Sequence, residues 1–271
     1  MTLKVKVPGS CGEFVQGFFN GAPLLITCPI EKFSTVTISD EFGGVEGLGE
    51  KSLAMLKKFG ACNFGIRLES ELPRAKGMAS SSADLAAVAK AVALFLGKNI
   101  SAEKIAEMAA SIEPTDGIFY GGVVAMNPVT GKLIKNISVA EKYAVAIFDY
   151  GGEVDTLKFN RRSNFQIPAL EDNLNFELIE KSALANQEIL YKKNLPQIIS
   201  FAKNIGAVTV NAAHSGTVIG IFFHGTDKKI DAKISEIARR FDFIKFLLKT
   251  NLTDGGFYDV SKNHQRFSAH K

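Results

Sequence analysis

The stretch that most constrains this chain runs from Pro73 to Asp84 and reads PRAKGMASSSAD. A glycine and three consecutive serines lead here directly into the alanine-rich apolar segment 85–96, and the apolar character on all sides predicts a buried helix. Small residues let a ligand approach the backbone closely, and the first turn of a helix offers free N–H groups and the positive end of its dipole. The stretch therefore predicts a binding site for a phosphate or another anion.

An ordinary capped helix is the simpler explanation, because serine is a favoured N-cap residue. One serine would suffice for a cap, and glycine followed by three serines goes beyond that need. The chain contains neither a GxxxxGK[ST] nor a GxGxxG motif, so the common nucleotide loops are excluded. The sequence favours a phosphate loop of another kind, formed by Lys76, Gly77, Met78, Ala79, Ser80, Ser81 and Ser82.

The composition narrows the class of protein. The chain has 271 residues, of which 46% are hydrophobic and 22% charged, with a formal net charge of +4. Such a chain is typical of a soluble globular protein with one large domain or two packed lobes. No basic run with interleaved aromatic residues predicts nucleic-acid binding, and no apolar run reaches the roughly 18 residues of a membrane span. Three widely spaced cysteines without a CxxC pattern favour a reducing compartment, so we expect a cytoplasmic protein.

Hydrophobic periodicity predicts an α+β fold, because strands and helices do not alternate strictly. Strands are expected at residues 3–8, 33–39, 63–71, 118–126, 143–149 and 216–223, and helices at residues 49–59, 83–96, 101–111, 171–191, 195–205 and 228–240. The glycine-rich residues 8–29 are expected to form a loop, residues 207–213 a helix, and residues 243–249 a strand or a short helix. A soft boundary near residue 140 predicts two lobes that share a cleft, residues 1–140 with the phosphate loop and residues 141–271.

Three stretches resemble the motifs of one family, the GHMP kinases. Residues 73–83 resemble its second motif, P-x-x-x-G-L-[GA]-S-S-[AS], with methionine in place of leucine. Residues 8–13 look like a shortened form of its N-terminal motif, and residues 213–220 resemble its C-terminal loop of small residues. The resemblance implies a two-lobed fold with a ribosomal protein S5-like N-terminal lobe and a ferredoxin-like C-terminal lobe. It also implies an ATP- and Mg²⁺-dependent kinase that phosphorylates a hydroxyl group of a small molecule.

Within that family, residues 11–17, 27–30 and 113–117 look most like the L-threonine kinases of the cobalamin biosynthesis pathway. This resemblance implies L-threonine as the acceptor, O-phospho-L-threonine as the product, and no nucleic acid or membrane as a partner. A homodimer is compatible with it. Homoserine, a sugar or a mevalonate-like alcohol is the alternative acceptor, and a nucleotide-binding protein without catalytic activity is the alternative outside this chemistry.

The resemblance also implies roles for particular residues. Asp116 matches the acidic residue of those members that have a catalytic base, although Asp-Gly shortly after a proline is also an ordinary turn signal. Ser81 matches the serine ligand of Mg²⁺ in the family. Glu107 is the nearest match to the acidic metal ligand, with Glu113 second, and a solvated helix face is the simpler explanation of Glu107.

The expected substrate site is less well marked. Some relatives carry a lysine after the first Pro-Gly, and Ser10 stands at that position here, which favours Asp116 over a lysine-assisted mechanism. An amino-acid substrate needs an anion for its ammonium group, and Glu13 is the first candidate, followed by Asp155 with Thr156. We therefore expect these four residues near the substrate, while polar residues of an ordinary protein surface are the simpler explanation.

Overall fold

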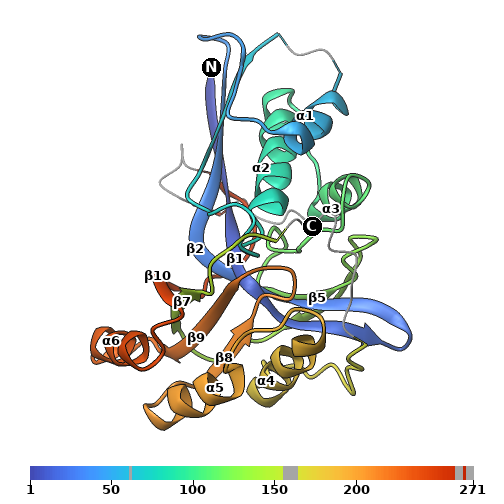
Figure 1. Cartoon of the computed structure of the whole chain (residues 1–271). Helices are drawn as coiled ribbons and strands as arrows, with labels where there is room; N and C mark the ends of the chain where they lie inside the picture. Colours follow the sequence, from blue (N-terminus) through green and yellow to red (C-terminus); the bar gives the residue numbers. More distant parts are fainter. Residues whose placement is uncertain (61–62, 155–163, 260–264, 267–271) are drawn as a thin grey trace.

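A long bent hairpin runs through the molecule and joins its two halves (Figure 1). The computed structural model describes residues 1–60, 63–154, 164–259 and 265–266. The hairpin consists of β1 (Thr2–Phe19) and β2 (Ala22–Ser39), paired antiparallel along most of their length. The first sheet has the order β12-β11-β1-β2-β4-β3, with β5 beside β2 and β6 beside β5. These strands are β3 (Val45–Glu46), β4 (Gly65–Ser70), β5 (Val123–Met126), β6 (Leu133–Ile137), β11 (Tyr258–Asp259) and β12 (Gln265–Arg266).

Helix α2 (Ser80–Phe95) packs on the upper part of this hairpin in Figure 1, and α1 (Glu50–Lys57) and α3 (Ala102–Ala110) pack on α2. Helix α2 contacts β1, β2, α1 and α3, and every residue from Ser82 to Ala93 is buried. Its many alanines make this enclosure possible, because small side chains let neighbouring backbones pack closely on all sides. The predicted buried helix behind the serines is therefore confirmed.

The second sheet lies at the other end of the molecule and has the order β10-β7-β9-β8. Its strands are β7 (Tyr143–Asp149), β8 (Thr209–Ala212), β9 (Val218–His224) and β10 (Lys245–Asn251). Helices α4 (Phe176–Ala185), α5 (Leu195–Asn204) and α6 (Ile230–Arg240) accompany this sheet, and a short 3₁₀ turn, η1 (Asn186–Glu188), follows α4. The buried side chains of α5 and α6 form a core with alternate residues of β9, among them Ile219 and Ile221.

The predicted mixed α+β fold is confirmed, and two local predictions were wrong. Residues 8–29 are not a loop, because β1 and β2 continue through them with register shifts near Gly9 and between Ser10 and Val15. Gly12 adopts φ +62° at this irregularity, and such a bulge lets a ladder continue through a glycine-rich segment. Residues 207–213 contain strand β8 instead of a helix, paired with β9 through the buried segment Thr209–Ala212.

The expected division near residue 140 falls between β6 of the first sheet and β7 of the second. The chain later returns to the first sheet, where β11 pairs with β1. The lobe boundaries thus stay a prediction. Within the part of the chain that the structure describes, none of the helices has the length and apolar character that crossing a bilayer requires.

Candidate active site

A cavity of about 940 Å³ lies where the two halves of the molecule meet. Its wall is built from β1, the start of α1, the serine loop, residues 113–116 and the turn at His214 and Ser215. A cavity of this size suits a small-molecule ligand. The three stretches that resembled family motifs therefore converge on one space, although they lie far apart in the sequence.

The backbone of the serine loop is held in an unusual conformation. Gly77 has φ +80° and Ala79 has φ +52°, and the carbonyl groups of Gly77 and Met78 each accept a hydrogen bond of 3.0 Å, from the N–H groups of Gly12 and Ser10 respectively. Ala79 is the N-cap of α2, and no side chain caps the first turn. The serines consequently do not act as helix caps, and the first turn keeps its N–H groups for a ligand.

Lys76 is the one member of the predicted loop whose side chain lies away from the cavity. Its Nζ lies 2.8 Å from Oδ2 of Asp149 and donates a 2.6 Å hydrogen bond to the carbonyl group of Gly152. Its own carbonyl group accepts hydrogen bonds from the N–H groups of Thr217 and Val218. Lys76 therefore ties the loop to the second sheet, and the structure gives its ammonium group a partner other than a phosphate.

Ser82 connects the loop to Asp116. Its Oγ accepts a 3.0 Å hydrogen bond from the backbone N–H of Asp116 and a 3.2 Å one from the hydroxyl of Thr115. The Asp116 side chain is buried, and burial raises the pKa of its carboxyl well above the usual value, helped by the nearby charge of Glu13. The hydroxyl of Ser10 acts in the opposite sense and lowers this pKa, although its Oγ forms no hydrogen bond of normal geometry.

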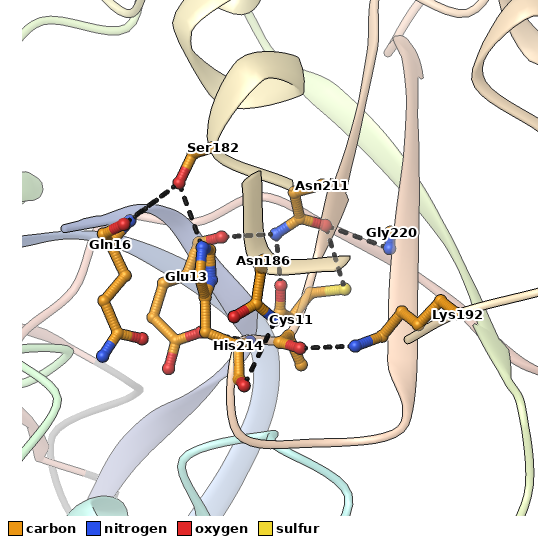
Figure 2. A network of polar contacts seen from close by, with 10 residues as sticks. Cys11, Glu13, Gln16, Ser182, Asn186, Lys192, Asn211, His214 and Gly220 are labelled. Carbon is orange, nitrogen blue, oxygen red and sulfur yellow. Dashed lines mark hydrogen bonds and ion pairs between the residues drawn. The ribbon is translucent and has the colours of Figure 1, made fainter. Parts of the chain in front are cut away.

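Glu13 lies at the irregular part of β1 and belongs to a polar network (Figure 2). Its Oε2 accepts a 3.1 Å hydrogen bond from the backbone N–H of His214 and lies 3.4 Å from Nδ1 of the same residue. Burial alone would raise the pKa of Glu13, but the side chain and backbone of His214 outweigh it and hold the pKa below its usual value. The paired carboxyls therefore differ: Glu13 favours its charged form and Asp116 its neutral form.

The rest of the network fixes the turn that carries His214. Nε2 of His214 lies 3.0 Å from Oγ of Ser182, which accepts a hydrogen bond from the backbone N–H of Gln16. Nζ of the buried Lys192 donates a 2.7 Å hydrogen bond to the carbonyl group of Ala213, and burial lowers its pKa to about 8 against the opposing charge of Glu13. These side chains hold β1, α4 and the 213–216 turn together (Figure 2).

This end of the cavity also carries buried polar atoms that form no hydrogen bond. Among the described residues, three lining side chains have a buried atom without a hydrogen bond: Gln16 Oε1, Asp116 Oδ1 and His214 Nδ1. Oγ of Ser10, beside Asp116, is also buried and forms no hydrogen bond. Buried polar atoms in folded proteins nearly always have a partner, so their concentration here indicates a place for a polar ligand.

At the loop itself, the acidic residue that contacts Ser81 is Glu113 and not the first candidate, Glu107. Oε1 of Glu113 accepts a hydrogen bond from the Ser81 hydroxyl, and Oε2 pairs with Nζ of Lys51. Glu107 is 69% exposed and pairs with Lys104 on the outer face of α3, as expected for a solvated helix face. Among the described residues no group of three or more His, Cys, Asp or Glu side chains could hold a metal ion. Mg²⁺ often uses one or two carboxylates together with substrate phosphates, so Ser81 and Glu113 fit such an ion.

Of the expected substrate residues, Ser10 and Glu13 lie together beside Asp116, whereas Asp155 and Thr156 fall outside the described residues. Four side chains that line the cavity or support it were not singled out by any motif: Gln16, Lys51, Asn186 and Lys192. Only Gln16 stands within a stretch that carried a signal, residues 11–17. The others come from helices and turns whose role depends on tertiary packing.

Comparison with known proteins agrees with this geometry. The family of the GHMP kinases N terminal domain matches residues 50–123. An L-threonine kinase from Citrobacter freundii is 26% identical, with 83% of this chain and 88% of that protein covered. An L-threonine kinase from Salmonella typhimurium is 27% identical, with coverages of 86% and 85%.

Solved structures show the same fold at lower identity. A homoserine kinase from Cytophaga hutchinsonii has a TM-score of 0.64 at 18% identity, with 95% of this chain and 97% of that chain covered. The mevalonate kinase of Methanococcus jannaschii has a TM-score of 0.60 at 13% identity, with coverages of 93% and 98%. The matched domain contains both the serine loop and Asp116. The chain therefore contains a GHMP kinase N-terminal domain and is a phosphotransferase that acts on an alcohol group.

Proposed function

We propose that this kinase transfers the terminal phosphoryl group of ATP to the hydroxyl of L-threonine and forms O-phospho-L-threonine. The observation that carries the proposal is the carboxyl pair of the partly buried Glu13 and the buried Asp116, beside the serine loop and among buried polar atoms that form no hydrogen bond. Relatives named L-threonine kinases support the choice of acceptor.

The two carboxyls suit different parts of an amino acid. Glu13, whose pKa is lowered, offers a negative charge to an ammonium group. Asp116 is then the group that accepts the proton of the acceptor hydroxyl and orients the oxygen for attack. A sugar or a mevalonate-like alcohol has no positive charge to offset that of Glu13 in a buried site, so the electrostatics favour an amino acid.

The opposite end of the cavity suits the donor. The free N–H groups at the start of α2 and the hydroxyl of Ser80 would receive the phosphates of ATP. Ser81 and Glu113 would hold Mg²⁺, which when bound neutralises the charge that develops on the transferred phosphoryl group. In this proposal the donor binds at the serine loop and the acceptor at Asp116. The hydrogen bond between Ser82 and Asp116 connects the two places.

We also assign the product to cobalamin biosynthesis and the enzyme to the cytoplasm. The first assignment rests on the resemblance of residues 11–17 and 113–117 to the L-threonine kinases of that pathway. The second rests on the cysteines, of which Cys11 and Cys28 are buried and free.

The substrate is tested by measuring ADP release with L-threonine, L-serine, L-homoserine, mevalonate and galactose. We expect the highest kcat/KM with threonine, about 10- to 200-fold above serine, because one methyl group in an apolar pocket typically contributes that much. Mass spectrometry should detect O-phospho-L-threonine as the product. Highest activity with homoserine, mevalonate or galactose would reject the acceptor assignment. ATP binding without ADP release from any of the five would favour a nucleotide-binding protein without catalytic activity.

The carboxyl pair also predicts a pH dependence. Asp116 must be ionised to accept a proton, so kcat/KM should rise with pH through its raised pKa. Glu13 contributes to that raised pKa by its charge, and Glu13→Gln removes the charge. The acid limb of the kcat/KM profile should therefore move to lower pH in this variant, whatever the loss in absolute rate. The acid limb reports the ionisation of the two carboxyls as a coupled pair and not that of one residue alone.

Glu153→Gln serves as the control, because Glu153 also lines the cavity but is not among the charges that shift the pKa of Asp116. Its acid limb should coincide with that of the unchanged protein. An acid limb that stays in place in Glu13→Gln would show that the two carboxyls are not coupled during turnover.

A further inference from the structure

The charges around the cavity do not match the ligand that a kinase must bind there. Its described lining residues include six acidic side chains: Glu13, Glu50, Asp84, Glu113, Asp116 and Glu153. Two lining residues, Lys51 and Arg74, carry basic side chains. A nucleoside triphosphate is itself a polyanion, and charges of like sign repel strongly where water is partly excluded. Some group must therefore offset the phosphate charge beyond the N–H groups of α2.

Of the two cations, Lys51 is the better placed. The side chain of Arg74 is 65% exposed, and its guanidinium lies 3.9 Å from Oδ2 of Asp84. Lys51 is 29% exposed, and its Nζ is paired with Glu113, which is only 9% exposed. The other oxygen of Glu113 accepts a hydrogen bond from the hydroxyl of Ser81. One carboxylate thus bridges Lys51 and the phosphate loop.

Lys51 reaches this place because it is the second residue of α1, a helix packed against α2. The amine and the first turn of α2 therefore face the same part of the cavity. A partly buried ion pair such as that of Lys51 and Glu113 is costly to break unless both charges find new partners. A ligand that takes one partner must supply a charge for the other, and a metal–triphosphate does so, because its cation suits Glu113 and its anion suits Lys51.

We propose that Lys51 is a phosphate-binding residue that exchanges partners, from Glu113 in the ligand-free protein to the β- or γ-phosphate of the bound nucleotide. The exchange frees Glu113 for the metal ion, so metal and nucleotide enter together. While Lys51 is paired with Glu113, the metal ion alone meets an already neutralised carboxylate and binds weakly. The inference rests on the proposed use of ATP, and it assigns to Lys51 a role that no motif in the sequence indicates.

The test measures nucleotide binding by titration calorimetry in the presence of EDTA, with ATP, ADP and AMP as probes. Lys51→Met should weaken ATP binding about tenfold or more, the usual effect of losing a charged hydrogen bond, and leave AMP binding unchanged. Lys57→Met on the exposed end of the same helix is the matched control and should bind all three like the unchanged protein. Equal ATP affinity in Lys51→Met and Lys57→Met would overturn the proposal, and so would an equal loss for AMP.

A second measurement addresses the exchange itself and does not depend on turnover. Glu113→Gln leaves the amine of Lys51 free, so it should strengthen metal-free ATP binding, and the gain should disappear in the double variant with Lys51→Met. Mn²⁺ without nucleotide, followed by electron paramagnetic resonance, should bind about tenfold more tightly to Lys51→Met than to the unchanged protein. The same Mn²⁺ affinity in both proteins would refute the exchange. Failure of the unchanged protein to bind ATP when Mg²⁺ is present would instead refute the proposed function.

Discussion

Asp116→Asn is expected to lower kcat by about two to four orders of magnitude, the range that general base catalysis contributes. Asparagine keeps the size of the side chain and can still accept hydrogen bonds from the backbone N–H groups of Gly117 and Ile118. In the unchanged protein these hydrogen bonds lower the pKa of the carboxyl. It cannot take a proton from the acceptor hydroxyl at any pH. The loss should therefore appear in kcat with every acceptor, and the acid limb of the pH profile should disappear.

Binding of the donor should be unaffected, because the hydrogen bond from Asp116 to the serine loop is donated by its backbone N–H, to Oγ of Ser82, and asparagine keeps that N–H. The affinity for ATP, measured by calorimetry, should stay within about twofold of that of the unchanged protein. Thr115→Val is a suitable control: it removes the neighbouring hydroxyl, which also donates to Ser82, and leaves the carboxyl in place. A kcat for Asp116→Asn equal to that of Thr115→Val would remove Asp116 from the chemistry.

The sequence predicts those helices and strands whose hydrophobic pattern is contained in a short stretch of the chain. Helix α2 was predictable because apolar residues continue on all sides after the serines, and β7 because Tyr143–Asp149 form one buried run. The hairpin was missed between residues 8 and 29 because glycines and prolines there signal a loop, whereas long-range pairing of β1 with β2 keeps the segment extended. Strand β8 was missed for a similar reason, since only its pairing with β9 distinguishes Thr209–Ala212 from a short apolar helix.

The residues of the candidate site likewise differ in whether a local motif or long-range packing reveals them. The serine loop and Asp116 lie in short stretches that resemble family motifs in the expected order, so the sequence alone indicates both. Lys51 and Glu113 meet only because α1 packs on α2, and Lys192 supports the 213–216 turn from the second half of the chain. Single charged residues on helices look alike in sequence. Their partners become known only when the helices are packed.

Gly77→Ala should lower kcat/KM for ATP by about two orders of magnitude, since misplacing reacting groups by roughly 1 Å costs that much. A Cβ atom at Gly77 would lie 2.7 Å from the Cβ of Ala213 and 2.8 Å from the Cα of Gly216. Neither atom belongs to a side chain that can rotate away. The loop must therefore shift from the 213–216 turn, and the N–H groups of α2 and the hydroxyl of Ser81 shift with it. Kinetics at varied ATP concentration would measure the loss.

Gly21→Ala separates this displacement from backbone strain. Gly21 has φ +78°, nearly the same as the +80° of Gly77, but a Cβ atom there meets nothing within 4 Å. Gly21→Ala should lose roughly 1–2 kcal/mol of stability in urea unfolding, because alanine resists this left-handed conformation, and Gly77→Ala should lose at least as much. Only Gly77→Ala adds the clash, so only this variant should lose activity as well. If Gly77→Ala instead matched Gly21→Ala in kcat/KM, close packing of the serine loop on the 213–216 turn would not be what positions ATP.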